Sequence, residues 1–184
     1  MAKFTVGYMI GSLAEESINR KLAGALVKLA PSELAMVEIS WKDLPLYSYD
    51  YDKDYPKVAV DFKDTIHGAD AILFVSPEYN RSIPGALKNA IDWASRPYGK
   101  NAFDGKPAAV IGASVGTIGT AVAQQHLKGV LGYCNMNLMQ SPEGYITMKP
   151  DLISDDGTVT VDSTREFLTK FMKAFADHIV RVKA

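Results

Sequence analysis

The chain has 184 residues, of which 47% are hydrophobic and 22% are charged, and its net charge is −1. These values are typical of a globular domain and exclude a disordered chain, a collagen or a membrane protein. A near-neutral charge gives no electrostatic reason to bind nucleic acid or an anionic membrane. The single cysteine excludes a disulfide framework and a thiolate zinc site, and the first residues turn polar too soon for a signal peptide. We expect one cytoplasmic domain over residues 1–184, without a metal.

Strand-like and helix-like patterns alternate along the chain. Short apolar runs predict five strands, at residues 4–10, 34–39, 71–75, 108–113 and 136–139. Apolar residues at helical spacing predict helices at residues 17–30, 58–67, 83–94 and 120–131, and from residue 163 onwards. We expect Ser82 to cap the third helix and a capping box at Ser163–Glu166 to begin the last one. Residues 43–57, rich in Tyr and Asp, are expected to form a solvated loop.

The alternation of five strands with helices predicts a parallel sheet, because parallel strands need crossover connections. The count favours a flavodoxin-like, doubly wound, five-stranded sheet of order 2-1-3-4-5 with helices on both faces, over a six-stranded dinucleotide-binding fold. In such sheets, ligands bind beyond the carboxyl ends of the strands, near the point where the strand order reverses. The loops after strands one, three and four are therefore the candidates for a binding site.

The first of these loops, residues 11–19, reads GSLAEESIN and leads into a helix. Free backbone N–H groups and the helix dipole attract an anion there, most often a phosphate. Ser12, Ser17 and Asn19 can add hydrogen bonds without adding charge. Alternatively, Ser17 only caps the helix. The loop contains neither a Walker A motif nor the dinucleotide fingerprint.

The second loop, residues 76–85, reads SPEYNRSIPG, and its two prolines make it stiff. Such a loop can hold a flat ring by stacking and backbone hydrogen bonds, or it is only a surface loop. Glu78 is a candidate general acid there, although the sequence offers no partner for it. The third loop, residues 112–119, reads GASVGTIG, and its glycines allow a ligand close to the backbone or simply make a tight turn.

These three loops resemble signatures of the NADPH-dependent FMN reductase family, close to its quinone and chromate reductase branch. The signature G-S-x-R-x-x-S-x-N is matched by Gly11, Ser12, Ser17 and Asn19. The signature P-E-Y-N-x-S-x-P-G-x-L-K-N-A-I-D-W is reproduced over residues 77–93, and G-A-S-x-G-x-x-G over residues 112–119. The resemblance extends from residue 4 to about residue 146.

The resemblance implies a bound FMN and gives each loop a role. The cofactor-binding residues that it implies are Ser12, Leu13, Ser17, Asn19, Pro77, Glu78, Tyr79, Asn80, Ser114, Val115 and Gly116. The first loop would hold the 5′-phosphate, the second would border the isoalloxazine and ribityl chain, and the third would close the other side of the ring. Ala14 stands where the signature has arginine, which predicts weaker FMN binding or compensation by Arg20, Lys21 or a neighbouring subunit.

The resemblance also implies an NAD(P)H-dependent oxidoreductase. NADPH or NADH would pass a hydride to flavin N5 and leave, and a quinone, free flavin, azo compound or metal oxyanion would then be reduced in a ping-pong scheme. No catalytic side chain is assigned; our hypothesis for Arg81 is that it steers an anionic donor or acceptor. The alternatives are a flavodoxin-type electron carrier, which the charge of −1 disfavours, and a non-redox phosphate-binding module or hydrolase. The family suggests a homodimer or homotetramer, with residues 85–97 as the candidate interface.

Overall fold

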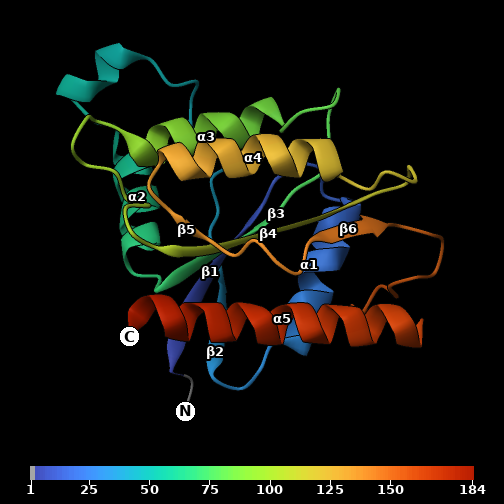
Figure 1. The fold of residues 1–184 in the computed structure, drawn as a ribbon. Coiled ribbons are helices and arrows are strands. Elements are labelled where there is room, and N and C mark those ends of the chain that lie inside the picture. Colours follow the sequence, from blue (N-terminus) through green and yellow to red (C-terminus); the bar gives the residue numbers. More distant parts are fainter. Residues whose placement is uncertain (1–2) are drawn as a thin grey trace.

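A parallel sheet lies at the centre of the computed structural model, which describes residues 3–184 (Figure 1). Its order is β2-β1-β3-β4-β5, and a further strand, β6, also pairs with β4. The strands are β1 Phe4–Ile10, β2 Leu34–Glu38, β3 Ala71–Val75, β4 Pro107–Ser114, β5 Asn137–Leu138 and β6 Gly144–Thr147. The flavodoxin-like, doubly wound order predicted from the sequence is therefore confirmed.

The fifth strand position differs from the prediction, because it is shared by two short strands. β5 pairs in parallel with the start of β4, at Pro107 and Ala108. β6 pairs in parallel with the end of β4, from Ile111 to Ser114. A Cβ on Gly144 would lie 2.5 Å from a side-chain carbon of Ile111, so glycine permits this close approach. The four residues of β6 were missed because their apolar pattern is too short to indicate a strand.

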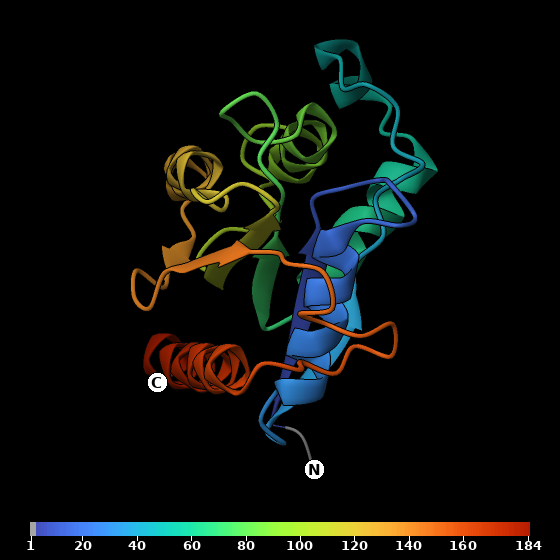
Figure 2. The same ribbon diagram turned by 90° about the vertical axis from the view of Figure 1, so that its right-hand side faces the viewer.

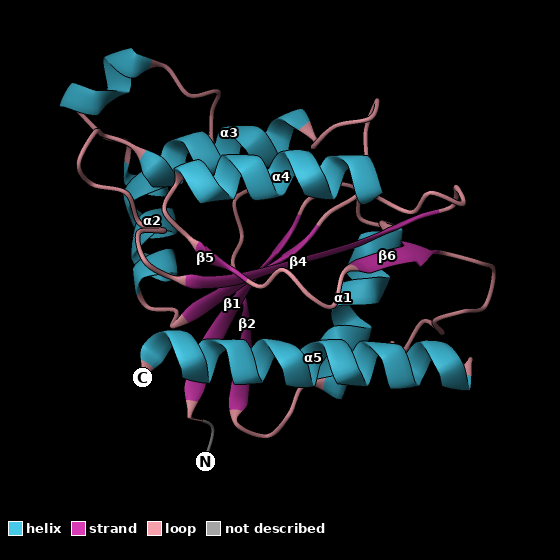
Figure 3. Cartoon of the chain, in the orientation of Figure 1, coloured by secondary structure: helices cyan, strands magenta, loops and turns pink. Residues whose placement is uncertain are grey.

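Residues 3–184 also form five α-helices and one short 3₁₀-helix (Figure 3), of which all but the last helix lie between successive strands. They are α1 Ile18–Leu29, η1 Tyr49–Lys53, α2 Lys57–His67, α3 Gly85–Ser95, α4 Ala121–Tyr133 and α5 Asp162–Lys183. Two predicted caps are wrong. Pro84 precedes α3, and Ser82 instead closes a tight turn two residues earlier. The N-cap of α5 is Val161, so Ser163 lies inside the first turn and cannot act as the cap of a capping box at Ser163–Glu166; Asp162 instead pairs with Arg165 at 2.7 Å.

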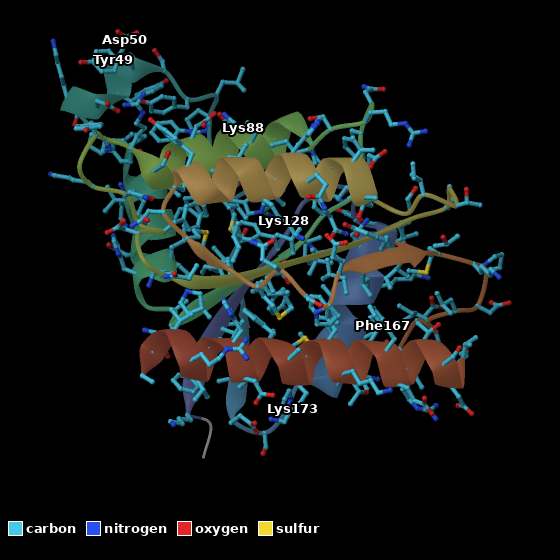
Figure 4. The ribbon with its side chains drawn as sticks, in the orientation of Figure 1. Tyr49, Asp50, Lys88, Lys128, Phe167 and Lys173 are labelled. Carbon is cyan, nitrogen blue, oxygen red and sulfur yellow. The ribbon has the colours of Figure 1, made fainter. Side chains whose placement is uncertain are left out.

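The helices cover both faces of the sheet and bury two separate cores. α1 and α5 lie on one face, where Phe171, Phe175 and Ile179 are buried against the sheet. α2, α3 and α4 cover the other face (Figure 2). All five residues of β3 are buried because this central strand is covered on both sides. Phe167, in the second turn of α5, is only half-buried (Figure 4).

The Tyr-rich segment before α2 is partly packed, which corrects the prediction of a solvated loop. Tyr47, Tyr51 and Tyr55 surround the Trp93 ring, with ring centroids 5.0–5.2 Å away. Trp93 is fully buried, so these tyrosines cover an apolar ring that α3 would otherwise expose. Tyr49 lies in η1, at the outer part of this segment, and is exposed (Figure 4).

None of the helices in residues 3–184 combines the length and the apolar composition that crossing a membrane would need.

Candidate functional site

The loops after β1, β3 and β4 meet at one edge of the sheet, which Figure 2 views from the front. Ser76 directly follows β3 and is buried between Gly11, after β1, and Gly112, in β4. A Cβ on Gly11 would lie 2.6 Å from Ser76 Oγ, and one on Gly112 would lie 2.0 Å from Ser76 O. Any side chain at either glycine would therefore push the loops apart. The two glycines let the three predicted loops converge.

The loop after β1 presents hydrogen-bond donors to an incoming anion. Ser17 caps α1, because its hydroxyl oxygen accepts a hydrogen bond from the Asn19 N–H at 3.2 Å. The hydroxyl proton of Ser17 remains free to donate. The backbone N–H groups of Glu15, Glu16 and Ile18 have no hydrogen-bond partner within residues 3–184. These donors at the positive end of a helix fit the phosphate of an FMN, and capping by Ser17 is compatible with an anion site here.

Asn19 has a structural position that the sequence did not indicate. Its side chain is fully buried, and its amide nitrogen donates to Ala113 O at 2.9 Å. Its amide oxygen accepts from Ala113 N, also at 2.9 Å. Both halves of the amide therefore join the start of α1 to the end of β4. In this structure both polar atoms of the Asn19 side chain are engaged with Ala113 and anchor the loop after β1 to β4. The resemblance instead implied that Asn19 contacts the phosphate.

The loop after β3 forms a two-residue hairpin. Tyr79 and Ser82 exchange two backbone hydrogen bonds of 3.0 Å, and Asn80 and Arg81 between them have φ angles of 50° and 61°. Asn readily adopts this left-handed conformation, whereas for Arg81 it costs about 1–2 kcal/mol, so the strain in this hairpin lies at Arg81. The Tyr79 hydroxyl lies 3.3 Å from the Ser12 hydroxyl and connects this loop to the loop after β1.

Glu78 holds this hairpin against α4. Its Oε2 accepts hydrogen bonds from the backbone N–H groups of Val122 and Ala123, both at 3.1 Å, and its Oε1 accepts from Arg81 at 2.8 Å. Burial raises the pKa of Glu78, but the hydrogen bonds from Ala123 and Arg81 outweigh burial and hold the pKa below its usual value. The carboxylate is ionised at neutral pH and has no proton to donate. It is therefore not the general acid that the sequence suggested.

A hollow of about 450 Å³ lies between the second and third loops. Its walls come from Glu78, Asn80 and Arg81 on one side and residues 114–119 on the other. Gly116 leaves space open there, since a Cβ would meet only Ser114 Oγ, at 3.6 Å. Val115 is 78% exposed at the rim and so presents an apolar side chain to solvent. Open backbone and apolar surface of this kind fit a flat, partly polar ring such as isoalloxazine.

The remaining predicted site residues lie close to these groups. Leu13 is exposed beside Ser12, Pro77 is buried directly after Ser76, and Ser114 Oγ accepts a hydrogen bond from Gly116 N at 3.2 Å. All three loops named from the sequence therefore contribute to one edge of the molecule.

The family model for NADPH-dependent FMN reductases matches residues 4–151. The chain belongs to this family. A 2-hydroxy-1,4-benzoquinone reductase from a Burkholderia species is 50% identical over 171 residues, which are 93% of each chain. A quinone reductase from Pseudomonas putida is 46% identical over 177 residues, covering 96% of this chain and 95% of the relative.

A solved structure agrees with the family assignment. FerB, a flavoenzyme NAD(P)H:acceptor oxidoreductase from Paracoccus denitrificans, is 47% identical and covers 97% of this chain and 98% of its own, with a TM-score of 0.93. Membership of the FMN reductase family confirms the predictions that this chain is an oxidoreductase, that its cofactor is FMN and that its electron donor is NAD(P)H. The individual residues that contact the cofactor stay a prediction.

Proposed function

We propose that this FMN reductase is an NAD(P)H-dependent quinone reductase whose FMN is bound across the three loops. The observation that carries the proposal is the pairing of a donor-rich helix N-terminus with the adjacent hollow of about 450 Å³. The contact between the Ser12 and Tyr79 hydroxyls joins the loop before this helix to the loop after β3, which forms one wall of the hollow. FMN, when bound, supplies hydride transfer from NAD(P)H to an acceptor. Quinones are the favoured acceptors because two relatives at 46% and 50% identity are described as quinone reductases.

The protein itself would bind FMN and orient it toward the donor and the acceptor. The free N–H groups of residues 15, 16 and 18, together with the hydroxyls of Ser12 and Ser17, are the proposed phosphate ligands. Residues 77–80 would border one side of the ring and residues 114–116 the other. One open face would then admit NAD(P)H and the acceptor in turn, which is the basis for proposing ping-pong kinetics.

Arg81 is the proposed steering residue for anionic ligands. Its side chain is 68% exposed, and one guanidinium nitrogen is anchored on the buried Glu78 carboxylate. It also lines the hollow. A guanidinium has five N–H donors, so Arg81 can still bind a phosphate or an oxyanion while it keeps its contact with Glu78.

We infer a homodimer or homotetramer from a second surface. A groove of about 720 Å³ lies between α3 and α4 and continues into the segment that follows α3. Tyr98 and Tyr133, which line it, are 91% and 92% exposed. Exposed aromatic side chains beside a groove are typical of protein interfaces.

Cys134 also lines the groove but is buried, and burial raises the pKa of its thiol, so it acts as packing rather than as a nucleophile.

Sedimentation of the wild type and of Tyr133→Asp tests this assembly. We expect the wild type to sediment as a dimer or tetramer and the variant as a monomer. A monomeric wild type, or a variant that assembles equally well, would contradict the interface.

We also propose a cytoplasmic location, because the free thiol of Cys134 and the use of NAD(P)H suit a reducing compartment.

An absorption titration tests the function itself. Purified protein is mixed with FMN and then with NADPH and NADH in separate anaerobic samples, before a benzoquinone is added. We expect the flavin bands to shift on binding, to bleach with at least one donor, and to return with the quinone. Binding without bleaching by either donor would indicate an electron carrier. Bleaching that a quinone does not reverse would exclude the quinone as acceptor.

A further inference from the structure

Arg20 lies beneath the loop after β1, between two surface hollows. One hollow, of about 480 Å³, is lined by Glu15, Glu16 and Ser17 among others. The other, of about 190 Å³, is lined by Ser12 and Leu13 among others. Arg20 lines both. The Arg20 side chain is therefore shared by the two hollows that border this loop.

In the present structure Arg20 is paired with Glu38, at the end of β2. One terminal nitrogen, Nη1, contacts both carboxylate oxygens, at 3.0 and 3.2 Å. The Tyr8 hydroxyl donates to the same carboxylate at 3.4 Å. The side chains of Arg20 and Glu38 are 46% and 39% exposed, and ion pairs so accessible to water are weak. Glu38 therefore holds Arg20 loosely, and Tyr8 would remain as a hydrogen-bond partner for the carboxylate.

The charges around the loop make Arg20 the suitable cation. Glu15, Glu16 and Glu38 are all negative, and they oppose the binding of a phosphate. Lys21, the next basic residue, is paired with Asp155 at 2.7 Å on the far side of the larger hollow. A guanidinium matches the oxygens of a phosphate with two parallel hydrogen bonds, whereas a single nitrogen serves both oxygens of Glu38 here.

We propose that Arg20 binds the phosphate of FMN and that it exchanges Glu38 for this phosphate when the cofactor enters. The inference rests on the proposed FMN site and adds the residue that makes this site specific for a phosphorylated flavin. Arg20 takes the part that arginine has at position 14 of the family signature, where this chain has alanine. Glu38 is the competing anion that keeps the guanidinium in place until FMN arrives.

Flavin fluorescence titrations with FMN and with riboflavin, which lacks the phosphate, test the exchange. Arg20→Ala should weaken FMN binding about 10- to 100-fold and leave riboflavin binding unchanged. Glu38→Gln should strengthen FMN binding, because it removes the competing carboxylate. Lys28→Ala is the matched control: Lys28 is on the same helix, is 50% exposed and pairs with Asp156, and we expect no change in FMN binding.

A rescue experiment distinguishes a role in binding from a role in folding. Adding Ala14→Arg to Arg20→Ala should restore FMN binding, which repair of a damaged fold would not explain. Three results would overturn the inference: unchanged FMN binding in Arg20→Ala, equal weakening for FMN and riboflavin, or weaker FMN binding in Glu38→Gln. If the wild type binds neither flavin, the proposed function itself fails. If the wild type binds FMN and Arg20→Ala binds it equally well, only the proposed exchange fails and the proposed function stands.

Discussion

The loops after β1 and β3 border the same site but are held in different ways. The loop after β3 is fixed by Glu78, whose buried carboxylate accepts two backbone hydrogen bonds from α4 and one from Arg81. The loop after β1 is held by neutral groups, the hydroxyls of Ser12 and Ser17 and the amide of Asn19. Its nearest cation, Arg20, is engaged with an exposed glutamate.

This difference indicates a division of work within the site. On the side that would receive the ring, the loop after β3 is held in place, and the charge of Glu78 is paired with that of Arg81. The side that would receive the phosphate leaves donors free and keeps its cation in a weak ion pair. If FMN binds as proposed, a rigid frame for the ring beside an adjustable anion site would favour a phosphorylated flavin. Substitutions at four positions test this comparison.

Gly112→Ala should have the largest effect, because it forces the end of β4 away from the loop after β3. Its Cβ would lie 2.0 Å from Ser76 O, which is backbone and cannot yield easily. We expect the free energy of unfolding to fall by about 3 kcal/mol or more in urea titrations. Gly116→Ala is the control, since its nearest atom would be 3.6 Å away, and it should unfold like the wild type. Equal stability of both variants would contradict this packing.

Asn19→Ala tests the neutral support of the loop after β1. The substitution leaves the N–H and C=O of Ala113 without their buried partner. We expect a loss of about 2–4 kcal/mol in the free energy of unfolding, together with weaker FMN binding. Asn137→Ala, which removes one exposed hydrogen bond to Gly105, should cost far less. A stable Asn19→Ala with normal FMN binding would mean that the loop does not depend on this link.

Glu78→Gln tests the charged support of the loop after β3. We expect a loss of about 2 kcal/mol at pH 7, because hydrogen bonds to a charged acceptor are replaced by weaker ones. The pKa of Glu78 is lowered in the folded protein, so its contribution is present above the unfolded pKa of about 4.3 and is lost as the pH falls through the folded pKa.

The difference in stability between the wild type and Glu78→Gln should therefore be constant from neutral pH down to about 5 and shrink below about 4. Urea unfolding at a series of pH values measures it. Glu166→Gln, at an exposed position on α5, serves as the control for removing a negative charge. A difference that does not depend on pH would show that the charge of Glu78 is irrelevant.

Arg81 should give the smallest change in stability and a separable change in kinetics. Because Arg81 has a φ of 61°, Arg81→Gly should be more stable than Arg81→Ala by about 1 kcal/mol. Both variants remove the guanidinium and should raise the KM for NADPH, while kcat changes less. Thermal unfolding and steady-state kinetics measure the two effects. An unchanged KM in both variants would remove Arg81 from the binding of the donor.

The sequence by itself determined the sheet order, the three loops and the cofactor. Apolar runs alternating with helical patterns were enough for the five predicted strands, and the sheet order placed the three candidate loops at one edge. The resemblance of these loops to the FMN reductase family indicated the cofactor. The sequence missed β6, because four residues carry too little pattern, and it misplaced the caps of α3 and α5, whose first turns use other groups.

Only the tertiary structure decided what the polar side chains of these loops contact. Asn19 binds Ala113, 94 residues away, and Glu78 binds Val122, 44 residues away. Both partners are backbone groups, which every residue carries and which therefore leave no signal in the sequence. Arg20 and Glu38 are brought together because β2 lies beside β1, whose loop leads into α1. Local patterns specify which segments form, whereas these long-range contacts depend on how the segments pack.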